Sequence, residues 1–182
     1  MTRSVAAARR ATLMWALVAA LVAACAAPSS RGPTYPPQGV SPPPAGEGSQ
    51  AALSQVLQAL AAAGLEATIS TRPYRPPEAA RLAAAARTVV QVKLPSDPER
   101  GLLAVYELGS SAAARAAAEE QAAYIATGPG RIQFPPDARF AIRLVGSSVV
   151  FFTWSPGSAS DPRTGDIATV LASVGTEVPV GA

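Results

Sequence analysis

The sequence predicts an α+β domain in which a mainly antiparallel sheet of about five strands carries helices on one face. Two pairs of β-rich runs are each joined by a short turn-forming segment, and hairpins of this kind pair their strands antiparallel. Between these runs lie segments whose apolar residues recur at helical spacing. The expected order is α-β-(α)-β-β-α-β-β-α. Because each helix has a single apolar stripe, we expect the helices to cover one sheet face.

The first helix is expected to begin with Ser49 as its N-cap and to end before Gly64. Its apolar stripe consists of Leu53, Val56, Leu57 and Leu60. Residues 65–71 then alternate between apolar and polar, which predicts a half-buried strand with Ile69 on its inner side. Residues 78–86 are rich in alanine and are expected to form a short helix.

Two hairpins account for most of the predicted sheet. Residues 88–94 and 102–108 are β-rich and are joined by a polar, turn-forming segment. Residues 139–145 and 149–154 predict a second hairpin, with a type II′ turn that begins at Gly146. The pairs expected on its inner face are Leu144 with Val149, Ile142 with Phe151, and Phe140 with Thr153.

Two further helices are expected in the C-terminal half. A long alanine-rich helix should run from Ser110 to about Ala126. Its solvent side is expected to carry Glu119, Glu120 and Gln121. The last helix should begin with Asp161 as its N-cap and end at Gly175. Its inner stripe consists of Ile167, Val170, Leu171 and Val174.

The N-terminal segment has the composition of an export signal. Three arginines precede an apolar run, residues 11–24, and Cys25 follows directly. The 14 residues of this run would make a helix of about 21 Å, whereas spanning a bilayer core takes about 20 apolar residues. We therefore expect residues 1–24 to be a processed signal peptide rather than a permanent transmembrane helix.

The residues in front of Cys25 are Leu21, Val22, Ala23 and Ala24. Together with the cysteine they resemble the lipobox of bacterial lipoproteins. The resemblance implies cleavage before Cys25, a diacylglycerol on its sulfur and, usually, acylation of the new amine. Two or more acyl chains hold a protein firmly on a membrane, so we expect a lipid anchor on the extracytoplasmic side of the cell membrane. The alternative is an ordinary secretory signal followed by an incidental cysteine.

Charge and composition narrow the domain organisation and the partners. The formal net charge is +3, but removal of the signal takes three arginines with it and leaves 12 basic and 12 acidic residues. Nucleic-acid binding needs a surplus of Lys and Arg, so no nucleic-acid partner is expected. Residues 25–48 are rich in Pro and Gly, which predicts a linker. Residues 49–176 would form the domain, and residues 177–182 a flexible tail.

Missing residue types exclude most catalytic machinery. The sequence has no histidine, which removes the usual general base and the imidazole metal ligands. Cys25 is assigned to the anchor, and the glycines of residues 128–130 lack the lysine of a phosphate-binding loop. We therefore expect no catalytic residue, no metal site and no cofactor. A site built from carboxylates is the chemistry that stays open.

A candidate binding face follows from the register of the second hairpin. Its outward pairs would be Arg143 with Val150, Ala141 with Phe152, and Arg139 with Trp154. Arginines interleaved with aromatic rings can bind an anionic or aromatic ligand, or a protein partner. The candidate residues are Arg139, Arg143, Phe152 and Trp154. The alternative is that Arg139 stacks on Trp154 and covers the solvent face of the sheet.

The domain also resembles small bacterial lipoproteins of unknown function in its order of elements. The matching pieces are Tyr106 to Leu108, Ala112 to Ala126, Gly128 to Gly130, Val149 to Trp154 and Leu171 to Gly175. This resemblance is one of pattern and implies no site residue. The leading expectation is a membrane-anchored, non-catalytic domain that binds an envelope protein or a small ligand. The alternatives are an accessory structural subunit of a cell-envelope complex and, third, a carboxylate-based hydrolase.

Overall fold

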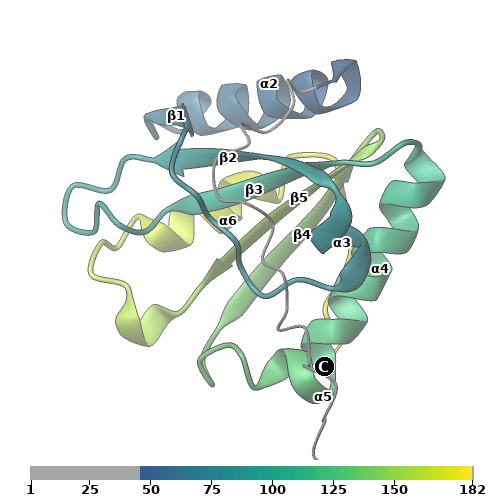
Figure 1. The fold of residues 1–182 in the computed structure, drawn as a ribbon. Coiled ribbons are helices and arrows are strands. Elements are labelled where there is room, and N and C mark those ends of the chain that lie inside the picture. Colours follow the sequence, from purple (N-terminus) through teal and green to yellow (C-terminus); the bar gives the residue numbers. More distant parts are fainter. Residues whose placement is uncertain (1–45, 182) are drawn as a thin grey trace, which may run out of the picture. The chain divides into compact units, whose positions relative to one another are not determined.

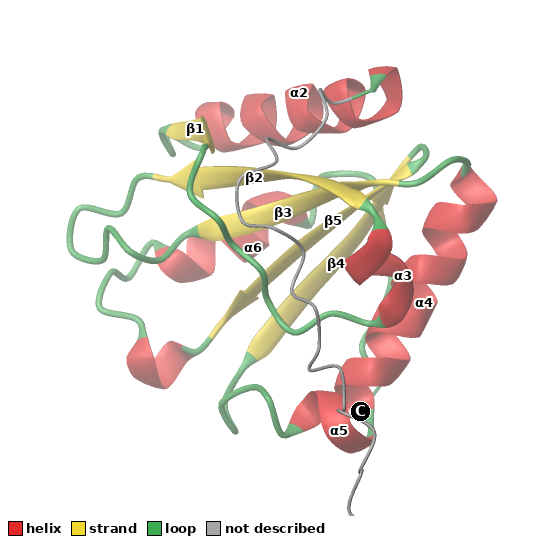
Figure 2. Ribbon diagram, viewed as in Figure 1, coloured by secondary structure: helices red, strands yellow, loops and turns green. Residues whose placement is uncertain are grey.

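The computed structural model describes residues 46–181, and its elements follow the predicted order (Figures 1 and 2). The helices are α2 (Glu47–Ala62), α3 (Ala80–Ala84), α4 (Ser111–Ala126), α5 (Gly128–Arg131) and α6 (Thr164–Leu171), with a 3₁₀ turn η2 (Pro156–Ser158). The strands are β1 (Ala67–Ser70), β2 (Ala86–Val92), β3 (Leu102–Glu107), β4 (Arg139–Val145), β5 (Ser148–Trp154) and β6 (Thr176–Glu177). The predicted signal peptide, lipobox and lipidated Cys25, with most of the linker, lie outside the described residues.

Six strands form one sheet in the order β1-β2-β3-β5-β4-β6, and every neighbouring pair is antiparallel. The predicted α+β class with an antiparallel sheet is confirmed. The sixth strand, β6, lies where a flexible tail was expected to begin, and that expectation is wrong. The backbone N–H of Val178 donates to the carbonyl of Ile142 at 3.0 Å, and its side chain is buried. Strand β6 therefore pairs with β4 and forms the edge of the sheet on that side.

Helices cover both faces of this sheet, and the expectation of one covered face is wrong. The face that carries Leu103 and Phe152 packs under α2 and α6. The opposite face, with Tyr106 and Phe151, packs under α3 and α4. Figure 1 shows α6 behind the strands and α3 in front of them. The physical reason is that β3 and β5 are apolar in both alternations, as strands buried on both sides are.

The predicted register of the second hairpin is confirmed. Leu144 pairs with Val149, Ile142 with Phe151, Phe140 with Thr153 and Arg139 with Trp154. Gly146 has a φ of +59°, while no residue other than glycine has a positive φ among residues 46–181. A positive φ at the first turn position alone is the type II′ geometry, whose twist matches that of the strands. The turn residue thus fixes which side chains of β4 and β5 share a face.

The N-terminus of α2 is capped from β3 rather than by Ser49, so the predicted cap is wrong. The backbone N–H of Gly46 donates to Oε2 of Glu107 at 2.8 Å. The hydroxyl of Ser49, inside the first turn, donates to the same oxygen and to the carbonyl of Gly46, both at 2.9 Å. A carboxylate here satisfies a free N–H and complements the helix dipole. Gly46 and Glu47, which precede the predicted boundary at Ser49, are therefore part of the capped helix.

Gln121 does not lie on the solvent side of α4, as predicted, but is fully buried. Its Oε1 accepts the backbone N–H of Ala79 at 2.6 Å, and its Nε2 donates to the carbonyl of Pro77 at 3.1 Å. This amide ties α4 to the segment that leads into α3. Helix α3 is shorter than the predicted residues 78–86, because the backbone is extended at Ala79 and again at Ala85.

Two other local expectations need correction. Ile69 is 58 % exposed, because β1 is an edge strand with a neighbour on one side only. The last helix, α6, begins at Thr164 rather than directly after Asp161. Asp161 still organises this start, since its Oδ1 accepts the backbone N–H of Arg163 at 3.0 Å.

Candidate functional site: a crevice at the end of the sheet

The predicted binding face is not a solvent-exposed surface. Phe152 is 1 % exposed and Arg143 is 6 % exposed, because α2 and α6 cover this side of the sheet. Arg139 is exposed and Trp154 is half-buried. The structure therefore buries Arg143 and Phe152, whereas Arg139 and Trp154 stay at least partly accessible.

Arg143 is a structural clamp for the end of α6. Its Nε donates to the carbonyl of Val174 at 2.8 Å, and its Nη2 donates to the carbonyls of Ala172 at 2.6 Å and Gly175 at 3.1 Å. Its Nη1 lies 3.2 Å from Oε2 of Glu177 on β6. A cation at this position satisfies carbonyls that the helix leaves free and complements the negative end of its dipole. All the polar contacts of this guanidinium are thus made within the fold.

Trp154 leads to a different site, at the point where β3 and β5 part. Within the described residues the pairing of these strands ends at Leu103 and Phe152. Beyond that pair, Leu102 remains paired with β2, whereas Thr153 and Trp154 remain paired with β4. Figure 1 shows the two halves of the sheet spreading apart at this end. A cavity of about 220 Å³ lies there, and we call it the sheet-end crevice.

Four aromatic side chains are among the residues that line the sheet-end crevice. They come from three separate segments of the chain: Tyr74, Phe134, Phe152 and Trp154. They are four of the eight aromatic residues in the described part of the chain. Phe152 and Trp154 stack with their ring centroids 5.3 Å apart and 12° between the planes. A lining of this kind favours an apolar or aromatic ligand group.

Tyr74 reaches the crevice from residues 71–79, which we call the crossing segment. This segment is held by Glu78, whose side chain is 2 % exposed. Oε1 of Glu78 accepts from the hydroxyl of Tyr106 and from Nη1 of Arg87, each at 2.5 Å. A buried carboxylate is stable only when it is paired and hydrogen-bonded, so these contacts fix the crossing segment against β2 and β3.

Both tyrosines near Glu78 stay neutral at physiological pH. Burial, and to a smaller extent the charge of Glu78, raises the pKa of Tyr74 to about 12. Burial and the hydrogen bond to Glu78 also raise the pKa of Tyr106. Tyr74 therefore presents a neutral phenol ring to the crevice.

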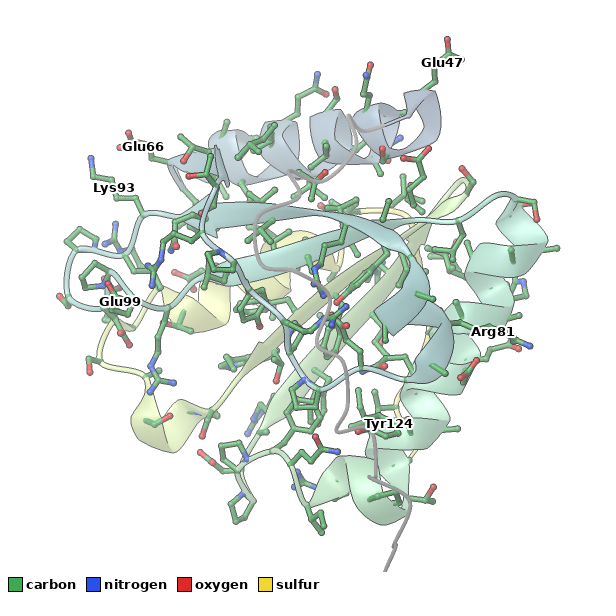
Figure 3. All side chains as sticks on the ribbon, viewed as in Figure 1. Glu47, Glu66, Arg81, Lys93, Glu99 and Tyr124 are labelled. Atoms are coloured by element: carbon green, nitrogen blue, oxygen red, sulfur yellow. The ribbon has the colours of Figure 1, made fainter. Side chains whose placement is uncertain are left out.

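Two loops, residues 93–101 and residues 155–163, also line the crevice, and the charges on this rim are paired. Nη1 of Arg100 donates to the hydroxyl of Ser158 at 3.1 Å, and its Nε lies 3.3 Å from Oδ2 of Asp97. Glu99, which is labelled in Figure 3, pairs with Nη2 of Arg72 at 2.5 Å. Each charged side chain that lines the crevice thus already has an opposite charge beside it.

Ser155 also lines the crevice, and its hydroxyl donates to Oδ1 of Asp137. Oδ2 of Asp137 accepts the backbone N–H of Gly157 at 2.6 Å. The hydrogen bonds from Ser155 and Gly157 lower the pKa of Asp137. A carboxylate stabilised in this way is a weak proton acceptor, so the pair is suited to fixing the loop rather than to activating a nucleophile.

Further properties of the described part of the chain bear on function. Among residues 46–181, no three His, Cys, Asp or Glu side chains are grouped so that they could hold a metal ion. None of the helices in this range is both long enough and apolar enough to cross a membrane. Comparison with protein-family models, with curated proteins and with solved structures finds no match to this chain.

Sequence reasoning named Phe152 and Trp154 but missed Tyr74 and Phe134. Both missed residues lie in proline-rich connections, in Arg72-Pro-Tyr and Phe134-Pro-Pro. An aromatic residue beside a proline in a connecting segment is a usable signal, since proline limits the conformations of the chain around it. The convergence of these segments on Trp154 depends on tertiary packing.

Proposed function

We propose that this chain is a lipid-anchored, non-catalytic binding domain on the extracytoplasmic side of the cell membrane, and that its ligand enters the sheet-end crevice. The anchor rests on the sequence, with Leu21, Val22, Ala23 and Ala24 in front of Cys25. The binding function rests on one observation, the convergence of four aromatic side chains on a cavity of about 220 Å³. Concave, mostly apolar sites with a few polar groups are the usual form of ligand pockets.

The position of the crevice supports this proposal. The linker joins the domain at Gly46, whose N–H is bonded to Glu107 at one end of β3. Gly101 and Leu102 line the crevice at the other end of that strand. The six residues of β3 correspond to about 20 Å of strand. A ligand in the crevice would therefore bind at the end of the domain far from the attachment point of the linker.

The anchor is tested by mass spectrometry of the full chain purified from cells fed with an alkyne-labelled fatty acid. The expected product begins at Cys25, carries two or three acyl chains and is labelled. Cys25→Ala should abolish the label and leave the chain uncleaved. An intact Met1, or a free thiol at Cys25, would overturn the anchor.

The crevice is tested by filling it. Ala159 lines the crevice, and Ala159→Phe should occupy part of its volume. Ala61, exposed on α2, gives the matched control Ala61→Phe. Because a ligand that binds the native state raises the unfolding temperature, the wild type and Ala61→Phe should unfold at a higher temperature in envelope preparations than when purified. Ala159→Phe should lose this difference. An equal gain in all three proteins would place the ligand elsewhere.

An accessory subunit of an envelope complex is the second candidate function. It is favoured by Ile132, which is 84 % exposed, and by Ile69, which is 58 % exposed. These two are the large exposed hydrophobic residues among residues 46–181. Such a subunit would migrate in a stoichiometric complex after mild solubilisation, and filling the crevice would not release it.

A further inference from the structure

The charges around the sheet-end crevice select against a charged ligand group. Arg100 is paired with Asp97, and Glu99 is paired with Arg72. The crevice therefore holds no charge without a partner among the described side chains that line it. Moving an ion from water into an apolar site is costly unless an opposite charge compensates it. A neutral group pays no such penalty, so the lining favours an uncharged occupant.

The volume of the crevice corresponds to one ring. Pockets for drug-sized ligands measure about 300–1,000 Å³, whereas an apolar cavity of about 150 Å³ holds benzene. At about 220 Å³, this crevice fits a single substituted aromatic ring. The rings of Tyr74, Phe134 and Trp154 line that space. Aromatic pairs are more favourable than the buried area alone predicts, which favours an aromatic occupant over an aliphatic one.

Main-chain groups border the same space. Gly101 has no side chain and so presents only its backbone to the crevice. Along β3 the hydrogen-bonding groups of successive residues point alternately to the two neighbouring strands. Because the N–H of Val92 bonds to the carbonyl of Gly101, the backbone of Leu102 points toward β5, where the ladder ends. The crevice therefore borders the end of the β3–β5 ladder.

A rigid apolar contact lies beside the crevice. Phe134 and Pro135 line the crevice, and Ile132, two residues earlier, is 84 % exposed. The guanidinium of Arg131 holds this loop through the carbonyls of Pro135 at 3.0 Å and Pro136 at 2.5 Å. An exposed isoleucine on such a loop, close in sequence to an aromatic pocket, is typical of a protein–protein contact, in which a few anchor residues supply most of the affinity.

We infer that the sheet-end crevice receives one uncharged aromatic side chain of a protein partner, and that Ile132 contacts the same partner beside it. This inference rests on the proposed function and names the class of ligand. The ring supplies the buried contact, and the paired rim charges disfavour acidic and basic side chains.

The choice of ring and charge is tested with three phenyl probes of matched size: 3-phenylpropanamide, 3-phenylpropanoate and 3-phenylpropylammonium. The protein purified in detergent micelles is used; the proposed cleavage before Cys25 removes Trp15 and leaves Trp154 as the single tryptophan. The amide should shift the indole N–H signal of Trp154 with a Kd of about 1 mM, the affinity of a fragment this small. The two ions should bind at least tenfold more weakly.

Several outcomes of this titration would overturn the inference. An ion that binds as tightly as the amide, or no shift with any of the three probes, overturns the inference. Ala159→Phe should abolish the shift by the amide, and the control Ala61→Phe should leave it unchanged. A shift that survives Ala159→Phe shows that the ring binds outside the crevice, which also overturns the inference.

The protein partner is tested with peptides from a random display library, selected on the full chain and counter-selected on Ala159→Phe. The selected peptides should share an uncharged aromatic residue and should bind Ile132→Ser at least tenfold more weakly than the wild type. The matched control is Ile69→Ser, which changes the other exposed isoleucine, on the edge strand β1. It should bind these peptides normally, and Ile132→Ser should still bind 3-phenylpropanamide.

Failure of the protein-partner inference and failure of the proposed function would give different results. Peptides that bind Ile132→Ser as tightly as the wild type would mean that the ring belongs to a free small molecule, and the protein partner would be wrong. An unfolding temperature in envelope preparations that is insensitive to Ala159→Phe would instead remove the proposed function, whatever the probes do.

Discussion

Asp97 and Asp161 lie on the two loops that wall the sheet-end crevice, and each accepts a hydrogen bond from the backbone of the other's loop. The N–H of Ser160 donates to Oδ2 of Asp97 at 3.1 Å. The N–H of Ser96 donates to Oδ2 of Asp161 at 3.2 Å. This reciprocal exchange locks the two loops to each other. A wall held in place before binding lowers the cost of ordering when a ligand arrives.

The first prediction concerns the acid sensitivity of this lock. The hydrogen bond from the guanidinium of Arg163 is the main reason that the pKa of Asp161 falls from its ordinary value of 3.8 to about 2. In the unfolded chain Asp161 binds its proton at a higher pH than in the folded protein. Its contribution to stability is therefore fully present above about pH 4 and is lost as the pH falls toward 2.

Urea denaturation across this pH range measures that contribution. Asp161→Asn should lower the free energy of unfolding at pH 7 and should flatten its decline between pH 4 and pH 2. Asp166→Asn, which changes an exposed acid two residues into α6, is the control and should leave the decline in place. Parallel curves for the wild type and Asp161→Asn across this range would contradict the assignment.

The second prediction concerns Arg143, which sequence reasoning placed on a binding face. Arg143→Met keeps the apolar stem and removes the donors to Val174, Ala172 and Gly175. Buried carbonyls without partners cost about 1–3 kcal/mol, and we expect a loss of that size in the free energy of unfolding. Thermal and urea unfolding measure it.

The control for Arg143 is its partner on β6. Glu177 is 69 % exposed, and exposed ion pairs contribute at most about 1 kcal/mol. Glu177→Gln should therefore destabilise far less than Arg143→Met. If the two variants lose equal stability, the ion pair and not the capping of α6 is the important contact.

The third prediction concerns Gln121. Gln121→Leu removes the buried bonds to the N–H of Ala79 and the carbonyl of Pro77. Two main-chain groups are left without partners, so the domain should lose about 1–3 kcal/mol of stability. Hydrogen exchange at Ala79 should accelerate more than exchange in β5. The matched control is Gln55→Leu, on the exposed side of α2, which should stay within about 0.5 kcal/mol of the wild type.

Local signals allowed much of the fold to be predicted. Gly146 sets the turn, the turn sets the register, and so Arg139 was correctly paired with Trp154. The side of the sheet on which a helix packs is a tertiary property. The presence of Arg143 on β4 suggested that one face of the sheet is polar, although its guanidinium donates hydrogen bonds to carbonyls at the end of α6. A long polar side chain on a strand does not by itself show that the strand faces solvent.

The site was harder to predict than the fold, because its parts are distant in the sequence. Tyr74 and Trp154 lie 80 positions apart and meet only because the crossing segment is tied down by Glu78. The buried Gln121 was misplaced for a related reason, since helical periodicity does not show which polar residue a neighbouring loop will bond. Contacts between a loop and a helix depend on the packed structure.

The last prediction concerns Gly101, which lines the crevice. This residue has a φ of +78°, a conformation that costs other residues about 1–2 kcal/mol. A Cβ there would lie 2.8 Å from the carbonyl oxygen of Val92 and 3.0 Å from Cδ1 of Leu94. Gly101→Ala should therefore lower the free energy of unfolding by more than the backbone conformation alone requires, and it should weaken binding of 3-phenylpropanamide.

Two glycine variants separate these causes. Gly146→Ala, at a φ of +59° with open space around it, should show only the conformational cost. Gly109→Ala, which has neither a positive φ nor a neighbour within 4 Å, should be close to neutral. The difference between Gly101→Ala and Gly146→Ala then measures the crowding against β2. If Gly101→Ala is no worse than Gly146→Ala, the backbone at the parted strands can move, and the crevice is not a rigid site.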